Sequence, residues 1–380
     1  MNAGNSRIHF IDLLRGVAVV AMVFGHTFDA VLEVESRSTA WFQLYTFLRG
    51  FTAPVFLFVS GLAFAVATEK RWSSFTRWSP HLRRRLLRVL LLLVIGYALH
   101  LPFYSLGKTL AETNERELRI FLQTDVLQCI AATLLLLHLL ILVLRDTTMF
   151  VRSTAALALM MTVATPYVWS VDLSSTVSPV IAPYLNGLTT SPFPLFPYAA
   201  FLLAGIVTGH YFGKAREFGE ADLFALRLAG ASAAIAVSAI LIDIALPSFV
   251  TNPVVWHTSP VITMLKLAGV LQLILLFVRI PAGRGRFVMR LELLGQTSFF
   301  VYAFHIALVY GSALNEGLSG TIGRTLNPGW AVAAAAGMVV CMDLIVQGWY
   351  AVSERYATAT RYGRIALASG LIYLFIIRPY

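Results

Sequence analysis

The chain has 380 residues, of which 58% are hydrophobic and only 13% are charged. Soluble domains carry about 25% charged residues, so this composition excludes a water-soluble globular protein. Lys and Arg number 29 against 19 Asp and Glu, an excess that could indicate a nucleic-acid partner, but its distribution follows the expected membrane spans instead.

Apolar runs long enough to cross a bilayer recur from one end of the chain to the other. A spanning helix needs about 20 mostly apolar residues. We therefore predict an all-α, polytopic integral membrane bundle of about 11 transmembrane helices, forming a single domain over residues 1–380. The expected spans are 10–32, 51–69, 86–106, 124–144, 150–171, 193–213, 223–246, 259–279, 291–311, 328–350 and 360–377.

The positions of the basic residues predict the orientation of these spans. With the N-terminus in the cytoplasm and the C-terminus outside, the inner connecting segments hold most of the Lys and Arg, above all residues 70–88 and 279–290. Basic residues favour cytoplasmic loops and attract anionic lipids. We thus expect a multi-pass protein of the cell inner membrane, with lipids as partners and no nucleic acid.

The first span carries ionisable residues, which cost about 2.5–3.5 kcal/mol each at the centre of a bilayer and therefore suggest function. Arg15 and His26 are separated by just over three helical turns, which places them on nearly the same face, about 16 Å apart along the axis. Asp12 and Asp29 each lie one turn from one of them and offer i,i+3 partners. The alternative is a set of structural ion pairs that hold helices together.

Other polar residues are expected at the level of His26, in the outer half of the membrane. They are His305 late in the ninth span, and Asp125 and Gln128 at the start of the fourth. A neutral imidazole can take a proton from an attacking hydroxyl or amine, and a carboxylate such as Asp29 can orient it. We predict catalytic roles for these two histidines with Asp29, and a substrate site at Asp125 and Gln128; a hydrogen-bonded core role for His305 is the alternative.

Several runs of the sequence resemble a known family. They read IDLLRGVAVVAMVFGH, FTAPVFLFVSGLAFA, DVLQCIA, FPLFPYAAFLLAGIVTG and LLGQTSFFVYAFH. Together these runs resemble the bacterial membrane proteins related to heparan-alpha-glucosaminide N-acetyltransferase, within the wider group of transmembrane acyltransferases that modify glycans. The resemblance touches most of the chain. It implies an acyl-CoA donor, such as acetyl-CoA, used from the cytoplasm, and an acceptor on the far side of the membrane.

The wider group also shows an Arg-x10-His pattern in its first span and an Arg-x-x-Arg pattern after its second. Arg15 with His26 and Arg85 with Arg88 are similar to these patterns. The resemblance implies that the arginines, with Asp12 beside Arg15, hold the acyl-CoA, since guanidinium groups pair with phosphates. A basic cluster before a span is also a common topology and lipid-headgroup signal, and this remains the alternative.

One departure from the family affects the expected acceptor. Heparan-alpha-glucosaminide N-acetyltransferase, the lysosomal enzyme of this family, has an asparagine at the position of His26, and its catalytic histidine lies a little further on. The present chain has no histidine between His26 and His81. The assignment of His26 as the catalytic histidine therefore follows the pattern of the glycan O-acyltransferases. We expect a glycan or glycolipid acceptor rather than heparan.

The predicted function is a membrane acyltransferase that moves an acyl group, expected to be acetyl, from acyl-CoA to an extracytoplasmic glycan-type acceptor. The alternatives are a proton-coupled secondary transporter that uses the first-span charges as its path, and a structural subunit. Gly-rich phosphate loops, zinc spacings and Gly-x-Ser-x-Gly elbows are absent from the sequence, so we expect no metal and no tightly bound cofactor. A homo-oligomer is compatible with the sequence. The single histidines His100, His138 and His210 are expected to serve helix ends or packing.

Overall fold

The computed structural model describes residues 8–173, 176–188, 190–246, 258–278, 280, 285–312 and 314–378. These residues form helices joined by turns and loops, with no strand among them beyond isolated bridges such as Leu32 with Leu326. The last residue of the expected span 259–279 lies outside the described residues.

Nine helices of the described part are long and apolar enough to cross a membrane, or ten if one bent pair counts as a single span. They confirm an all-α, polytopic membrane protein, while the orientation of the termini stays a prediction. Two of the expected spans differ. The span expected at 291–311 is broken into two helices bent by 81°. The span expected at 86–106 is a helix that runs from Pro80 to Ala98; it ends ahead of Pro102, and the arginines in its first turns lower its hydropathy.

Contacts divide the described chain into two compact units. The first unit comprises 1–52, 98–121 and 282–380, and the second comprises 53–97 and 122–281. The expectation of a single domain stays a prediction, and each unit is described by itself.

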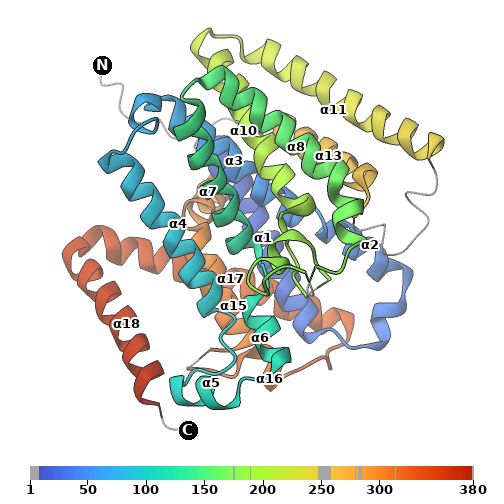
Figure 1. Cartoon of the computed structure of the whole chain (residues 1–380). Coiled ribbons are helices and arrows are strands. Elements are labelled where there is room, and N and C mark those ends of the chain that lie inside the picture. The colour runs from blue at the N-terminus through green and yellow to red at the C-terminus, as the bar shows by residue number, and fades with distance from the viewer. Residues whose placement is uncertain are drawn as a thin grey trace. The chain divides into compact units, whose positions relative to one another are not determined.

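The first unit is organised around the N-terminal helix α1, which packs against α14, α15 and α17 (Figure 1). Most of α1 is buried, because it is apolar on several faces and has neighbours on more than one side. The helices of this unit are α1 (His9–Val31), η1 (Glu35–Ser38), α2 (Ala40–Arg49), α5 (Leu106–Glu112), α6 (Glu115–Leu122), α14 (Arg286–Gln296), α15 (Ser298–Tyr310), α16 (Gly317–Thr321), α17 (Pro328–Arg355) and α18 (Ala357–Ile377).

The second unit is a bundle in which α10 packs against α7, α8 and α11, and α11 packs against α13. Figure 1 shows α8, α10, α11 and α13 side by side in green to yellow-orange. The helices of this unit are α3 (Thr52–Glu69), η2 (Trp72–Ser74), α4 (Pro80–Ala98), α7 (Val126–Leu144), α8 (Thr147–Trp169), α9 (Ala182–Leu185), α10 (Leu195–Glu217), α11 (Ala221–Ala245) and α13 (Pro260–Val278).

Helices α1 and α14 cross at two glycines. A Cβ atom added to Gly16 would overlap the carbonyl oxygen of Leu291, and one added to Gly295 would overlap the carbonyl oxygen of Asp12. Membrane helices approach this closely only where a residue has no side chain. The crossing therefore holds the turn of α1 that contains Asp12 and Gly16 directly against α14.

The 81° bend between α14 and α15 follows immediately after this crossing. Thr297 stands between the two helices, and its hydroxyl donates to the carbonyl of Leu293 over 2.8 Å. A threonine hydroxyl that bonds back to the preceding turn favours a bend in a helix. The bend allows α15 to pack on α1 as well, so both helices of the broken span contact the first span.

A similar glycine crossing joins α3 and α10 in the second unit. A Cβ atom on Gly61 would overlap the carbonyl oxygen of Leu202, and one on Gly205 would overlap that of Phe58. The glycines in the runs VSGLAF and LLAGIV are thus explained by close backbone contact.

We expect Gly16→Leu to destabilise the protein by at least about 1–3 kcal/mol, because the new side chain forces α1 and α14 apart. The measurement is the thermal unfolding midpoint of purified protein in detergent. Gly337→Ala on α17 is the matched control, since a Cβ atom there meets nothing within 4 Å, and its midpoint should not fall. Equal midpoints for the two variants would contradict the crossing.

Candidate functional site

Two histidines from distant parts of the chain meet inside the first unit. His26 lies on α1 and His305 on α15. The Nε2 atom of His305 and the Nδ1 atom of His26 are 3.2 Å apart, and the ring centroids are 5.2 Å apart. His305 is completely buried. The two imidazoles predicted to lie at one level are therefore in direct hydrogen-bonding contact.

The hydrogen bonds around this pair define which nitrogen carries each proton. The Nδ1 atom of His305 lies 2.8 Å from the carbonyl oxygen of Val301, and a carbonyl can only accept, so Nδ1 carries the proton. In a neutral imidazole the other nitrogen is then an acceptor. The Nε2 atom of His305 accordingly accepts from Nδ1–H of His26, which leaves the lone pair of His26 on its Nε2 atom. This is the protonation state that a general base requires.

Tyrosines also lie near the histidine pair. The ring of Tyr310 stands edge-on to His26 with 5.9 Å between centroids. On α2, the hydroxyl of Tyr45 donates to the Asp29 carboxylate at 3.1 Å and lies 3.3 Å from the carbonyl oxygen of Gly25. The surroundings of His26 thus combine a second imidazole, aromatic rings and hydroxyl groups.

The Asp29 carboxylate pairs with Arg49 of α2. Gly25 makes room for this partner, since the nearest atom to a Cβ there would be Cδ of Arg49 at 3.2 Å. The carboxylate therefore has a guanidinium and the Tyr45 hydroxyl as partners, while the hydrogen-bond partner of His26 is His305.

Arg37 closes the C-terminal end of α1. Its Nη2 atom donates to the carbonyl oxygens of Asp29 at 2.6 Å and Leu32 at 3.1 Å, which are among the carbonyls that the end of a helix leaves without partners. Burial, followed by the charge of Arg324, lowers the pKa of the Arg37 guanidinium from its usual value, but an arginine so placed still carries its charge. Arg37 thus fixes the end of the helix that carries His26.

Arg15 lies on the same unbroken helix as His26, about 16 Å away by helical rise. The structure therefore has the continuous helix on which the predicted separation of Arg15 and His26 depends. Asp12 lies one turn before Arg15 on this helix. No ion pair between Asp12 and Arg15 is found among the described residues, so the expected pairing stays a prediction.

The two arginines of the Arg-x-x-Arg pattern have different environments in the second unit. Arg85 donates to the hydroxyl of Thr68 at 2.5 Å, and its guanidinium lies 4.1 Å from the ring centroid of Phe75 and 4.9 Å from that of Phe64. Arg88, one turn further along α4, is exposed. Arg85 is thus held within the unit, whereas the Arg88 side chain reaches solvent or lipid headgroups.

Asp125 and Gln128 lie at the N-terminal end of α7. Asp125 caps the helix, and its carboxylate accepts from the backbone N–H of Val126 at 2.7 Å. Gln128 is completely buried, and neither its amide nitrogen nor its amide oxygen has a hydrogen-bond partner among the described residues.

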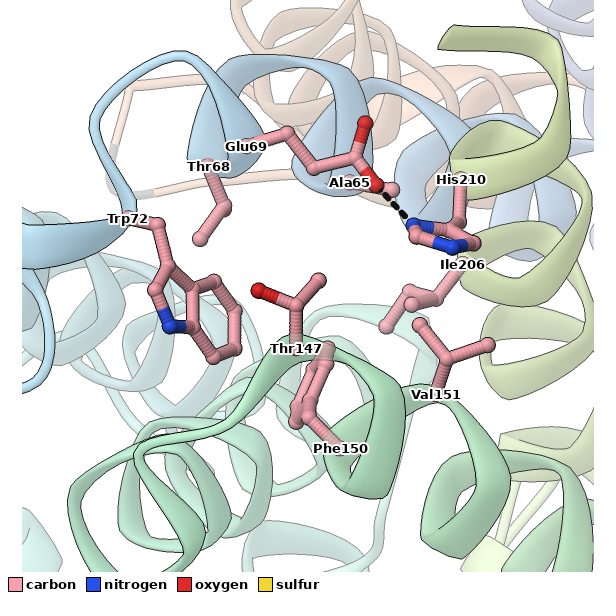
Figure 2. Close-up of a pocket in the computed structure, with 9 residues that line it drawn as sticks. All are labelled: Ala65, Thr68, Glu69, Trp72, Thr147, Phe150, Val151, Ile206 and His210. Carbon is pink, nitrogen blue, oxygen red and sulfur yellow. Dashed lines mark hydrogen bonds and ion pairs between the residues drawn. The ribbon is translucent and has the colours of Figure 1, made fainter. Parts of the chain in front are cut away.

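A small pocket of the second unit contains an ion pair that the sequence did not indicate (Figure 2). Glu69 at the end of α3 pairs with His210 of α10, beside Trp72, Thr147 and Phe150. The pocket offers about 10 Å³ of water-accessible volume, which is about the space that one water molecule needs. It is too small for an acyl chain or a sugar. In the described chain, no group of three or more His, Cys, Asp or Glu residues could hold a metal ion.

The structure brings together some of the predicted site residues and reveals others. His26 and His305 meet, Asp29 lies one turn beyond His26, and Arg15 lies on the same helix, all in the first unit. The predicted Arg85, Arg88, Asp125 and Gln128 belong to the second unit. The sequence prediction missed Arg49, Tyr45, Tyr310 and the Glu69–His210 pair. Their roles depend on partners that belong to other helices, and the spacing of residues within one span cannot predict such contacts.

Comparison with known proteins places this architecture in a family. A search of curated proteins finds no match. An acyltransferase domain model matches residues 8–347, which is most of the chain and includes the helices that carry the histidine pair. The chain therefore belongs to this family of membrane acyltransferases.

Proposed function

We propose that this acyltransferase moves an acetyl group from acetyl-CoA, taken from the cytoplasm, to a hydroxyl group of a glycan or glycolipid acceptor outside the inner membrane. The observation that carries the proposal is the His26–His305 contact, which leaves the Nε2 atom of His26 free to accept a proton. Membership of the acyltransferase family supports the reaction class. The resemblance to bacterial relatives of heparan-alpha-glucosaminide N-acetyltransferase supports acetyl-CoA as donor and a glycan as acceptor.

The proposed reaction is a direct transfer. The thioester of acetyl-CoA supplies the activated acyl group. His26 Nε2 takes the proton of the acceptor hydroxyl while the hydroxyl oxygen forms its bond to the acyl carbon. The carbon–sulfur bond breaks, and the proton on His26 passes to the sulfur of the departing CoA. His305 holds the ring of His26 in the reactive tautomer and shares the positive charge that develops on it.

The arginines account for binding of the anionic donor in this proposal. Arg15 and the exposed Arg88 offer guanidinium groups that pair with CoA phosphates in charge-assisted hydrogen bonds. Arg85, already bound to Thr68 and stacked between aromatic rings, acts by positioning its part of α4. The expected excess of basic residues on the cytoplasmic side agrees with entry of the donor from that side.

We expect His26→Ala to lower the rate of acetyl transfer by about 10²–10⁴-fold, which is the usual contribution of a general base. His305→Ala should cost about 10- to 100-fold, because His26 then loses the group that selects its tautomer. His305→Gln should recover part of this loss, since its amide oxygen can accept from Nδ1–H of His26. The measurement is release of free CoA thiol by purified protein in nanodiscs.

His9→Ala is the matched control, because His9 lies on the same helix with its side chain 54% exposed, and its rate should not change. Unaltered turnover in His26→Ala would reject the assignment. Proton-driven solute uptake in liposomes without consumption of thioester would instead favour a transporter.

We expect Arg88→Ala to raise the KM for acetyl-CoA by about tenfold or more, because the variant loses one charge-assisted hydrogen bond to the donor. Its thermal stability should not change. Arg85→Ala should also lower the unfolding midpoint, because it removes the contacts with Thr68, Phe64 and Phe75. Arg361→Ala, which removes an exposed arginine of α18, controls for net charge. A KM that does not respond to Arg88→Ala would show that this arginine does not bind the donor.

A further inference from the structure

Two arginines lie at the C-terminal end of α1 in the first unit. Arg37 belongs to η1, shortly after α1, and Arg324 lies in the segment between α16 and α17. The backbone N–H of Glu33 donates to the carbonyl of Leu326 at 2.9 Å, and the N–H of Leu326 donates to the carbonyl of Val31 at 2.9 Å. These two bonds hold the segment that carries Arg324 beside the end of α1.

The Arg37 side chain is held in place while part of its guanidinium has no acceptor. Its Nη2 atom donates to the carbonyls of Asp29 and Leu32, and its Cζ atom lies 5.5 Å from the ring centroid of Phe42. The buried Nε atom has no hydrogen-bond partner among the described residues, and no hydrogen bond of Nη1 is found there either. A guanidinium carries five N–H groups, so those of Nε and Nη1 remain unused.

No carboxylate of the described chain pairs with either of these arginines. Arg37 and Arg324 form no ion pair there. The acidic groups of this end have other partners, since Asp29 pairs with Arg49 and the Glu33 carboxylate accepts from a serine hydroxyl at 2.6 Å. Burial and then the charge of Arg324 lower the pKa of the Arg37 guanidinium. Two like charges held this near repel each other, and a bound anion would offset that repulsion.

The location of the two arginines favours phosphate as that anion. Helix α1 is long and apolar enough to cross the membrane, and the ends of such helices lie at the level of the lipid headgroups. Guanidinium groups match phosphate oxygens in geometry as well as in charge. Arg324 is exposed and Arg37 is partly exposed, so a phosphate can reach both.

We propose that Arg37 and Arg324 together form a phosphate-binding site at the end of α1. The phosphate belongs to a lipid, either a phospholipid of the membrane or a lipid-linked phosphate. Arg37 binds the carbonyl of Asp29, three residues beyond His26, so the site begins about one helical turn beyond His26. A phosphate bound there holds its lipid beside the helix that carries the histidine pair.

The test measures the unfolding midpoint of the purified full chain in a detergent and a buffer that contain no phosphate. The probes are phosphatidylglycerol and farnesyl phosphate, and their neutral counterparts are diacylglycerol and farnesol. A phosphate-bearing probe should raise the midpoint of the wild type, whereas its neutral counterpart should not. Arg324→Gln should weaken the apparent affinity for that probe by about tenfold or more, because it loses a charge-assisted hydrogen bond to the phosphate.

Further measurements separate phosphate recognition from charge and from folding. Without lipid, Arg324→Gln should keep the wild-type midpoint, since Arg324 has no hydrogen bond or ion pair in the described part of the chain. Arg37→Lys keeps the charge but loses the planar fork, so it should also weaken the lipid response. Arg116→Gln is the control, because it removes another exposed arginine of the same unit, and its lipid response should stay intact.

The outcomes also identify the source of the phosphate. A response to phosphatidylglycerol alone assigns the site to a membrane phospholipid, and a response to farnesyl phosphate extends it to a lipid-linked phosphate. No response to either probe, an equal response to the neutral lipids, or an undiminished response in Arg324→Gln overturns the site.

A higher KM for acetyl-CoA in Arg324→Gln, with an unchanged lipid response, assigns this arginine to the donor and also overturns the site. The midpoint is measured without turnover, so failure of the phosphate site leaves thioester consumption as a separate result. Loss of thioester consumption in the wild type would reject the proposed function and not the phosphate site.

Discussion

The contact between two helix backbones at Gly16 and Gly295 is the constraint on which the candidate active site depends. It holds α14 against α1 at the turn that carries Arg15. The 81° bend then follows within a few residues, and α15 packs along α1, so that His305 reaches His26. A side chain at either glycine would separate the helices. In lipid the hydrophobic effect does not hold helices together, so their association depends on close van der Waals packing.

Within each unit, an ion pair joins a charged group of a membrane helix to a second helix. Asp29 pairs with Arg49, and Glu69 pairs with His210. An unpaired charge in a low-dielectric interior is expensive, so such pairs determine which helices can be neighbours. The histidine pair differs in kind, since two neutral imidazoles linked to a carbonyl form a chain of hydrogen bonds with a defined direction. That direction leaves the Nε2 lone pair of His26 available, as the proposed role of a general base requires, whereas the ion pairs join helices.

The arginines show why a motif does not by itself assign a role. Arg85 and Arg88 belong to one short pattern, yet Arg85 is held by Thr68 and two aromatic rings while Arg88 is exposed. The Glu69–His210 pair shows the converse, because it joins positions 141 residues apart that no pattern in the sequence connects. Polar residues of membrane helices are thus recognised easily, but their partners decide whether they bind, position or only stabilise.

The sequence by itself determined the membrane class, most spans and the relation of Arg15 to His26, because hydropathy and helical periodicity are local properties of the chain. The sequence did not reveal that the span expected at 291–311 is broken at Thr297. The hydropathy averaged over these residues hides the break. Only the tertiary structure decided that His26 bonds to His305, 279 residues away, and that Asp29 pairs with Arg49. It also decided that the Gln128 amide has no hydrogen-bond partner among the described residues. These outcomes depend on how closely helices approach, and that distance is determined by glycines on both sides of a contact rather than by any single span.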